Sequence, residues 1–217
     1  MKKFIKSNQA FFLCYTVFLL LLFPFFLLYT KAEIHLAINK YHAAAFDYFF
    51  RIMTFFGDGI TPFIFAVALT FFSFRKSITI AATGTLAGLL AQFLKRMVFT
   101  DMPRPARYFE GIYDLHLIEG VSMNYSYSFP SGHSATAFAL FLCLAGYVNQ
   151  RSLKLLMFLM ALIVAFSRVY LSQHFLVDIY AGSIIGVISA IILIPVFNKL
   201  QNTWLDKSFI NLARSKD

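Results

Sequence analysis

The sequence predicts an all-α polytopic membrane protein, a bundle of six transmembrane helices. Of its 217 residues, 59% are hydrophobic and only 13% are charged, a composition typical of membrane proteins. Six apolar stretches have lengths near that of a helix crossing a bilayer, the second being the shortest: residues 11–29, 60–74, 77–94, 131–148, 153–171 and 175–198. No repeat, low-complexity tract or Pro/Gly/Ser-rich linker divides the chain, so we expect one domain over residues 1–217.

The first stretch follows three lysines, Lys2, Lys3 and Lys6. No small-residue cleavage site comes after it, so we interpret it as the first span and not as a signal peptide. Between the first and second stretches, residues 30–59 carry His35, His42, Asp47, Arg51 and Asp58 among aromatic residues. This mixture is typical of an amphipathic segment at the membrane interface, and we expect an outer segment here.

The third stretch contains Gly84 and Gly88, and Lys95 lies seven residues beyond Gly88. Small residues mark the faces where membrane helices approach closely, so we expect Lys95 to point into the bundle. Residues 100–127 then form the longest polar stretch, which is rich in tyrosine. Its length and aromatic content predict a second outer segment that lies over a pocket as a lid.

The fourth stretch opens with Pro130, Ser131, Gly132 and His133. Proline suits the first turn of a helix, and glycine lets a ligand approach the backbone. The unpaired N–H groups at a helix start bind anions, so we interpret this turn as a phosphate cradle with His133 as a nearby proton donor.

Arg168 ends the fifth stretch and His174 begins the sixth, where His174, Asp178, Gly182 and Gly186 recur every four residues. Residues four apart share a helix face, so Asp178 can hold one ring nitrogen of His174 while the other attacks phosphorus. Arginine and lysine supply donors for phosphoryl oxygens. Together these patterns predict a phosphate pocket that contains its own nucleophile.

The basic residues predict the orientation of the chain, because lysine and arginine are retained on the cytoplasmic side. If the chain crosses the membrane six times, eleven of its nineteen lysine and arginine residues fall on the same side as both termini: Lys2, Lys3, Lys6, Arg75, Lys76, Arg151, Lys154, Lys199, Lys207, Arg214 and Lys216. We therefore expect an inner (cytoplasmic) membrane protein with cytoplasmic termini. The opposite side receives Lys95 with Arg104, the Pro130–His133 turn, and Arg168 with His174. This predicts an active site on the periplasmic or extracellular side.

The net charge of +9 is spread over short connections and forms no basic stripe on a soluble domain. This charge reflects the orientation of the chain in the membrane, with anionic membrane lipids as neighbours. We expect no nucleic-acid partner. Cys14 and Cys143 lie within spans without ligand spacing, and we interpret them as packing residues. No carboxylate and histidine cluster surrounds the basic pocket, so we expect neither a metal ion nor another cofactor.

Three motifs carry a resemblance to a known family: Lys95 with Arg104-Pro105, the Pro130–His133 run, and Ser167-Arg168 with His174 and Asp178. They resemble the signatures of the type 2 phosphatidic acid phosphatase superfamily, and the six-span layout covers nearly the whole chain. The resemblance implies that Lys95, Arg104 and Arg168 bind the phosphate and that Ser131 and Gly132 assist. It also implies that His133 is the general acid, His174 the nucleophile and Asp178 its orienting partner.

The first motif departs from the family pattern, which has six residues between its lysine and its Arg-Pro pair. Here eight separate Lys95 from Arg104, and Met97 occupies the expected place. Either two residues are inserted before Pro103, or Arg96 replaces the lysine, or that function is lost. The helical phase favours Lys95 for the lysine role of this motif.

We therefore expect a metal-independent lipid phosphatase that hydrolyses a phosphomonoester or pyrophosphate through a phosphohistidine. A phosphotransferase with an alcohol in place of water is an alternative, and a non-catalytic lipid transporter is a weaker one, because it would not need the pair of His174 and Asp178. The motifs indicate that the substrate carries a phosphate, but they do not identify the alcohol to which the phosphate is attached. Phosphatidylglycerophosphate, phosphatidic acid, undecaprenyl pyrophosphate and lipid A phosphates all stay candidates.

Overall fold

The computed structural model describes residues 2–214, which are helical and contain no strand. The helices are α1 (Lys2–Ser7), α2 (Gln9–Leu28), α3 (Lys31–Asn39), α4 (Ala44–Met53), η1 (Thr54–Gly57), α5 (Thr61–Thr70), α6 (Phe74–Phe93), η2 (Leu94–Val98), α7 (Pro105–Tyr108), α8 (Gly132–Tyr147), α9 (Arg151–Tyr170), α10 (Leu176–Lys199) and α11 (Phe209–Arg214). The all-α prediction is confirmed.

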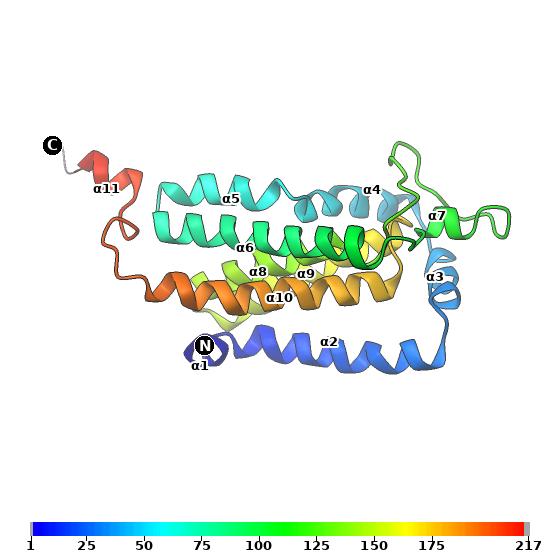
Figure 1. The fold of residues 1–217 in the computed structure, drawn as a ribbon, viewed down its shortest axis with the longest axis horizontal. Helices are drawn as coiled ribbons and strands as arrows, with labels where there is room; N and C mark the ends of the chain where they lie inside the picture. The colour runs from blue at the N-terminus through cyan, green and yellow to red at the C-terminus, as the bar shows by residue number, and fades with distance from the viewer. Residues whose placement is uncertain (1, 215–217) are drawn as a thin grey trace.

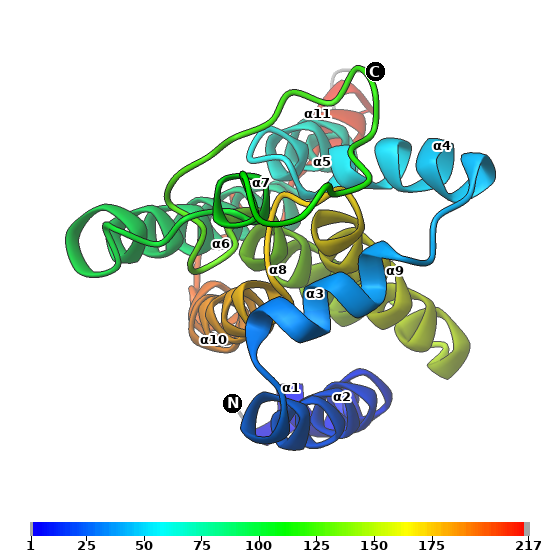
Figure 2. The same ribbon diagram turned by 90° about the vertical axis from the view of Figure 1, so that its right-hand side faces the viewer.

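The long helices lie side by side along one axis, with α1 and α11 at one end and α3 and α7 at the other (Figure 1). Seen along this axis, α8 lies in the middle of the bundle and α3 crosses its end (Figure 2). Helix α8 contacts α6, α9, α10 and η1, whereas α2 packs on α9 and α5 packs on α6. The chain termini therefore lie far from the end that carries α3 and α7.

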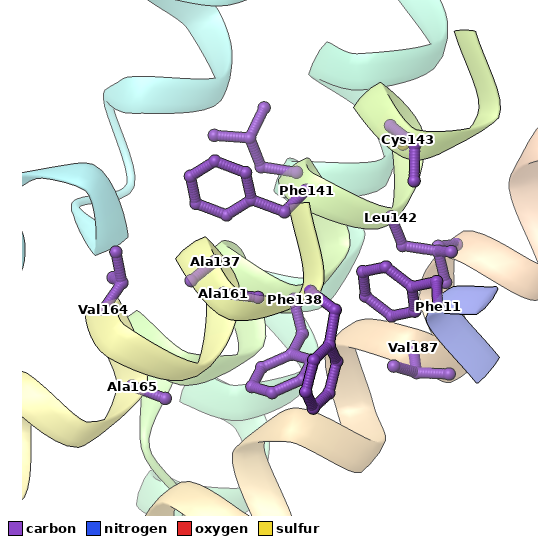
Figure 3. Packing of buried hydrophobic residues seen from close by; sticks show 14 of the residues in the cluster. Phe11, Ala137, Phe138, Phe141, Leu142, Cys143, Ala161, Val164, Ala165 and Val187 are labelled. Atoms are coloured by element: carbon purple, nitrogen blue, oxygen red, sulfur yellow. The ribbon is translucent and has the colours of Figure 1, made fainter. Parts of the chain in front are cut away.

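Helix α8 can occupy the centre because its sequence is rich in alanine, leucine and phenylalanine and contains no charged residue after His133. Its Phe138, Phe141 and Leu142 pack against side chains of α2, α9 and α10 (Figure 3). On α10, a Cβ added at Gly182 or Gly186 would come within 2.3 Å of a carbonyl oxygen of α8. These glycines let the two helix backbones touch, as the spacing in the sixth stretch predicted.

Fewer helices are long enough to cross a membrane than the six apolar stretches of the sequence suggested. Helices α2, α9, α10 and the continuous α6–η2 are long and apolar enough to cross a membrane. The segments Ala44–Gly57 and Thr61–Thr70 pass the same test only together, as a pair bent by 63°, and α8 has just 16 residues. The described residues thus hold four spans, or five with the bent pair, and the count of six stays a prediction.

The predicted outer segment 30–59 is divided in the structure. Helix α3, which begins at a capping box of Thr30 and Glu33, lies across the end of the bundle. Helix α4 and η1 instead run toward α5 and lie along the bundle (Figure 1). The break between η1 and α5 falls at Asp58 and Gly59, just before Pro62 at the start of α5, where a helix is easily interrupted.

Candidate active site

All three sequence motifs lie at the end of the bundle that carries α3 and α7. Lys95 lies in the π-helical turn η2, Arg104 precedes α7, and His133 lies in the first turn of α8. Arg168 ends α9, and His174 lies in the loop before α10. Lys95, Arg104, Arg168 and His174 are all buried, so the fold gathers three cations and a histidine in a space largely closed to solvent.

His174 is held on one side by the carboxylate of Asp178. The Nδ1 atom of His174 lies 3.3 Å from Oδ2 of Asp178, which also accepts hydrogen bonds from the hydroxyl of Ser128 at 2.5 Å and the amide of Phe175 at 2.9 Å. These contacts fix Nδ1 as the protonated nitrogen. The Nε2 atom is therefore the one that carries the free electron pair, as the spacing of four residues predicted.

Burial lowers the pKa of His174 well below its ordinary value, and the positive charges of Lys95, Arg104 and Arg168 act in the same direction. An imidazole can attack phosphorus only in its neutral form. The same cations that would hold a phosphate therefore also keep His174 in the reactive protonation state at neutral pH.

Arg168 has an unused donor inside the site. Its Nη1 atom donates to Oγ1 of Thr54 at 2.6 Å, whereas its buried Nε atom has no hydrogen-bond partner in the part of the chain that the structure describes. A buried N–H without an acceptor is costly and calls for an explanation. A phosphoryl oxygen would satisfy it, because guanidinium groups bind phosphate through pairs of parallel N–H donors.

Arg104 is fixed by the loops around it. Its Nε atom donates to the carbonyl of Ser126 at 3.0 Å, and its Nη1 atom donates to the carbonyl oxygen and Oε1 of Gln173, both at 3.2 Å. The Nη2 atom of Arg168 also reaches Oε1 of Gln173, at 3.5 Å. A single amide oxygen therefore lies between the two arginines. No pattern in the sequence singled out Gln173, although the residue directly precedes His174.

Lys95 and its neighbour Arg96 differ sharply in placement. Lys95 is 5% exposed and interacts electrostatically with Arg104, Asp178 and Arg168, whereas Arg96 is exposed. The predicted stripe leading to Lys95 is not a continuous seam: Gly84 packs on Pro62 of α5, but a Cβ at Gly88 would meet open space. Lys95 instead continues the buried face formed by Ala87 and Ala91, which lie eight and four residues before it.

The Pro130–His133 turn caps α8. The hydroxyl of Ser131 accepts hydrogen bonds from the amide and hydroxyl of Ser134, and the amide of Ser131 donates to the carbonyl of Asp178. The side chain of Ser131 is thus occupied as the N-cap. The amides of Gly132 and His133 lie in the first helical turn, where no carbonyl of the helix can accept from them. Apart from the neighbouring residues and the backbone of α8 itself, no heavy atom of residues 2–214 lies within 4 Å of the Cβ position at Gly132, which leaves room beside these amides.

His133 has a carboxylate partner that sequence reasoning missed. Its Nε2 atom lies 2.7 Å from Oδ1 of Asp58, in the break between η1 and α5. The contact depends on Gly57, because a Cβ there would lie 2.9 Å from Cγ1 of Val164 and 3.1 Å from Cβ of His133. Asp58 was predicted to lie in an interfacial segment, and only the Gly57–Gly59 pair hinted at a turn.

Helix α3 supports the loop that carries His174. The backbone of Ser172 has a positive φ of 51°, an unfavourable conformation for a residue with a side chain. Its hydroxyl lies 3.2 Å from Nε2 of His35 and accepts from Nδ2 of Asn39 at 3.3 Å. The ring of His35 lies between Phe109 and Phe175. His35 and Asn39 therefore hold the loop in shape, and burial lowers the pKa of His35 to about 4.

Among residues 2–214, no three histidine, cysteine or acidic side chains lie close enough to hold a metal ion. The two cysteines are free, and Cys143 is buried in the core. The positive charge at this site comes from Lys95, Arg104 and Arg168, and these are the residues that would hold an anionic ligand.

The chain is similar to known proteins in sequence and in fold. The model of the PAP2 superfamily matches residues 76–202, a region that includes the site from Lys95 to Asp178 but not Thr54 or Asp58. A curated lipid A 4'-phosphatase from Bacteroides thetaiotaomicron is 29% identical over 163 residues, which is 71% of each chain.

Two crystal structures share the fold. LpxE from Aquifex aeolicus superimposes with a TM-score of 0.66 at 29% identity, covering 75% of this chain and 93% of the other. A transmembrane PAP2-type phosphatidylglycerolphosphate phosphatase from Bacillus subtilis gives a TM-score of 0.61 over 90% of this chain and 98% of its own. Its identity of 20% supports a common fold alone.

Proposed function

Because the chain belongs to the PAP2 superfamily, we propose that it is a membrane lipid phosphatase that works through a phosphohistidine at His174. The observation that carries this proposal is the contact of Asp178 with Nδ1 of His174, in a buried site that also holds three cations. This geometry presents a neutral Nε2 atom to a phosphate bound among positive charges.

In the first step, Nε2 of His174 attacks phosphorus while the bond to the lipid oxygen breaks. His133 gives its proton to that oxygen, which leaves as the alcohol of the lipid, or as a lipid monophosphate when the substrate is a pyrophosphate. Lys95, Arg104 and Arg168 stabilise the negative charge of the transferring phosphoryl group. Asp178 stabilises the positive charge that develops on the ring of His174.

In the second step, water attacks the phosphohistidine. His133, now neutral, takes a proton from this water, the bond between phosphorus and Nε2 breaks, and inorganic phosphate is released. Asp58 accepts a hydrogen bond from His133 throughout, so it favours the protonated ring in the first step and fixes its direction in the second. The charge needed for the reaction comes from protein side chains, so we propose a reaction that needs no metal ion.

For the substrate, we propose a phosphomonoester or pyrophosphate of a membrane lipid. The similarity to the lipid A 4'-phosphatase supports a phosphomonoester on a lipid headgroup as the first candidate to assay. The distribution of basic residues supports an inner membrane location with cytoplasmic termini and a site on the other side. Labelling of Tyr125→Cys, in the exposed outer segment, by an impermeant maleimide in intact cells tests this orientation; labelling of Lys207→Cys alone would reverse it.

The proposed activity is tested by phosphate release from a panel of lipid A phosphate, phosphatidylglycerophosphate, phosphatidic acid and undecaprenyl pyrophosphate, in detergent with a chelator present. We expect release by the wild type and none by His174→Ala. His133→Ala, supplied with an activated aryl phosphate, should accumulate a phosphohistidine, because the water that resolves it lacks its base. Activity in a well-folded His174→Ala variant would refute the nucleophile, and lipid movement without phosphate release would favour a transporter.

A phosphotransferase would use the same intermediate. Transfer of the phosphoryl group to glycerol or another added alcohol, in preference to water, would identify it. The burial of His174 and Arg168 limits the size of the acceptor, and we expect water to be the favoured one.

A further inference from the structure

A basic cavity lies between α1, α2 and the start of α9. Helix α1 is at the end of the bundle opposite α3 and α7 (Figure 1). The cavity has a volume of about 610 Å³, and its lining includes three basic residues, Lys6, Arg151 and Lys154. The ammonium group of Lys154 is buried and donates to Oδ1 of Asn8 at 2.9 Å and to the carbonyl of Ala145 at 3.2 Å. A lysine has three donors, so one N–H of this fixed ammonium is left for the cavity.

The three helices that line the cavity contain no acidic residue. The sequence has no aspartate or glutamate before Glu33 and none between Glu119 and Asp178, so α1, α2 and α9 contain only basic ionic groups. Within residues 2–214, none of the ion pairs includes Lys6, Arg151 or Lys154. A buried ammonium without a counter-ion is costly. The cavity offers the place from which an anion could reach it.

The rest of the lining combines uncharged polar residues with apolar ones that face outward. Among the apolar residues, Ile5 and Leu13 are 37% and 58% exposed on the surface of the bundle. Helix α2 is long and apolar enough to span a membrane, so this surface lies where lipid acyl chains pack. A ligand that fits must therefore combine a negative headgroup with a hydrocarbon chain.

We propose that this cavity binds the phosphodiester headgroup of one anionic phospholipid, with an acyl chain along Ile5 and Leu13. The site is separate from the catalytic residues and is independent of the proposed reaction. Lys6 and Arg151 contact the phosphate from the rim, and Lys154 contacts it from below. The bound lipid ties α1 to α9 at the end of the bundle where Ala10 and Phe11 of α2 are buried.

The test is native mass spectrometry of the protein from neutral detergent, titrated with phosphatidylglycerol. This lipid is a phosphodiester, so it offers no terminal phosphate to His174. The variant Lys6→Gln/Arg151→Gln removes two charges from the cavity, and Lys2→Gln/Lys3→Gln removes two charges from α1 outside it. From the usual contribution of basic residues at an anionic membrane surface, the first variant should bind about thirtyfold more weakly. The second should bind like the wild type.

Equal affinity of both variants would overturn the proposal, as would equal binding of phosphatidylcholine and phosphatidylglycerol to the wild type. A third arm uses inorganic phosphate alone. If it displaces phosphatidylglycerol at low millimolar concentration, the cavity recognises a free anion and the lipid assignment is wrong. Thermal unfolding of each variant without added lipid checks that the substitutions leave the fold intact.

Discussion

Replacement of Asp58 by asparagine tests whether this carboxylate, and not only the three family motifs, belongs to the catalytic machinery. The carboxylate accepts a hydrogen bond of 2.7 Å from His133, and the two side chains are 40% and 28% exposed. Hydrogen bonds to charged groups contribute about 1.5–3 kcal/mol, and the partial exposure places this one at the lower end. We expect Asp58→Asn to lower kcat/KM for a lipid phosphate about tenfold.

The loss should depend on the leaving group. A lipid alkoxide needs a proton from His133, whereas an aryl oxide leaves readily without one. Asp58→Asn should therefore retain most of its activity on an aryl phosphate. The missing carboxylate also disfavours the protonated ring of His133, so the alkaline limb of the pH profile on lipid phosphate should move to lower pH.

The assay is phosphate release from both substrates between pH 5 and 9, with Asp114→Asn, an exposed acid in the outer segment, as the matched control. The double variant with His133→Ala completes a cycle. If Asp58 acts through His133, its replacement should have no further effect once His133 is gone. An undiminished tenfold loss in that background, or equal losses on both substrates, would refute the reasoning.

Three further predictions concern the surroundings of the two arginines and the loop. Lys95→Ala should lose turnover and inhibition by vanadate while Arg96→Ala keeps both, since only Lys95 is buried in the site; the reverse pattern would assign the lysine role to Arg96. Gln173→Glu should raise KM at least tenfold relative to Gln173→Met, because a carboxylate between the arginines competes with phosphate; equal KM values would contradict this. The pKa of His35 is lowered to about 4, below its value of about 6.5 in the unfolded chain, so its contribution to stability is present above pH 6.5 and is lost as the pH falls toward 4. The wild type should lose on the order of 2 kcal/mol more than His35→Phe between pH 7.5 and 5, measured by denaturant unfolding, and parallel losses would count against it.

The residues of the three motifs could be identified from the sequence, because each motif lies within a short segment. Asp178 lies one helical turn from His174, and Gly182 and Gly186 continue the same face onto α8. Such patterns are local, so spacing alone reveals them. The placement of Lys95 was anticipated for an incomplete reason, since the buried face that leads to it is formed by Ala87 and Ala91 and not by Gly88.

The partners of these residues could not be predicted, because their contacts depend on how distant segments pack. Asp58 reaches His133 across 75 positions, and Thr54 reaches Arg168 across 114. Ser128 and Gln173 are adjacent to motif residues but have no periodic relation to them. The sequence also gave no measure of the bend between η1 and α5, so residues 44–57 were expected at the interface and not along the bundle.

These supporting contacts divide the site into two parts with different origins. The groups that touch phosphate in the proposed reaction lie within residues 76–202, the region shared with the family. The groups that orient them from outside, Asp58 on His133 and Thr54 on Arg168, come from η1 and the break after it. His35 on α3 supports Ser172 in the same way. The N-terminal helices can therefore adjust the proton donor and the loop of the nucleophile while every motif residue stays unchanged. Replacement of Asp58 or Thr54 therefore separates the effect of these supporting contacts from the effect of the motif residues themselves.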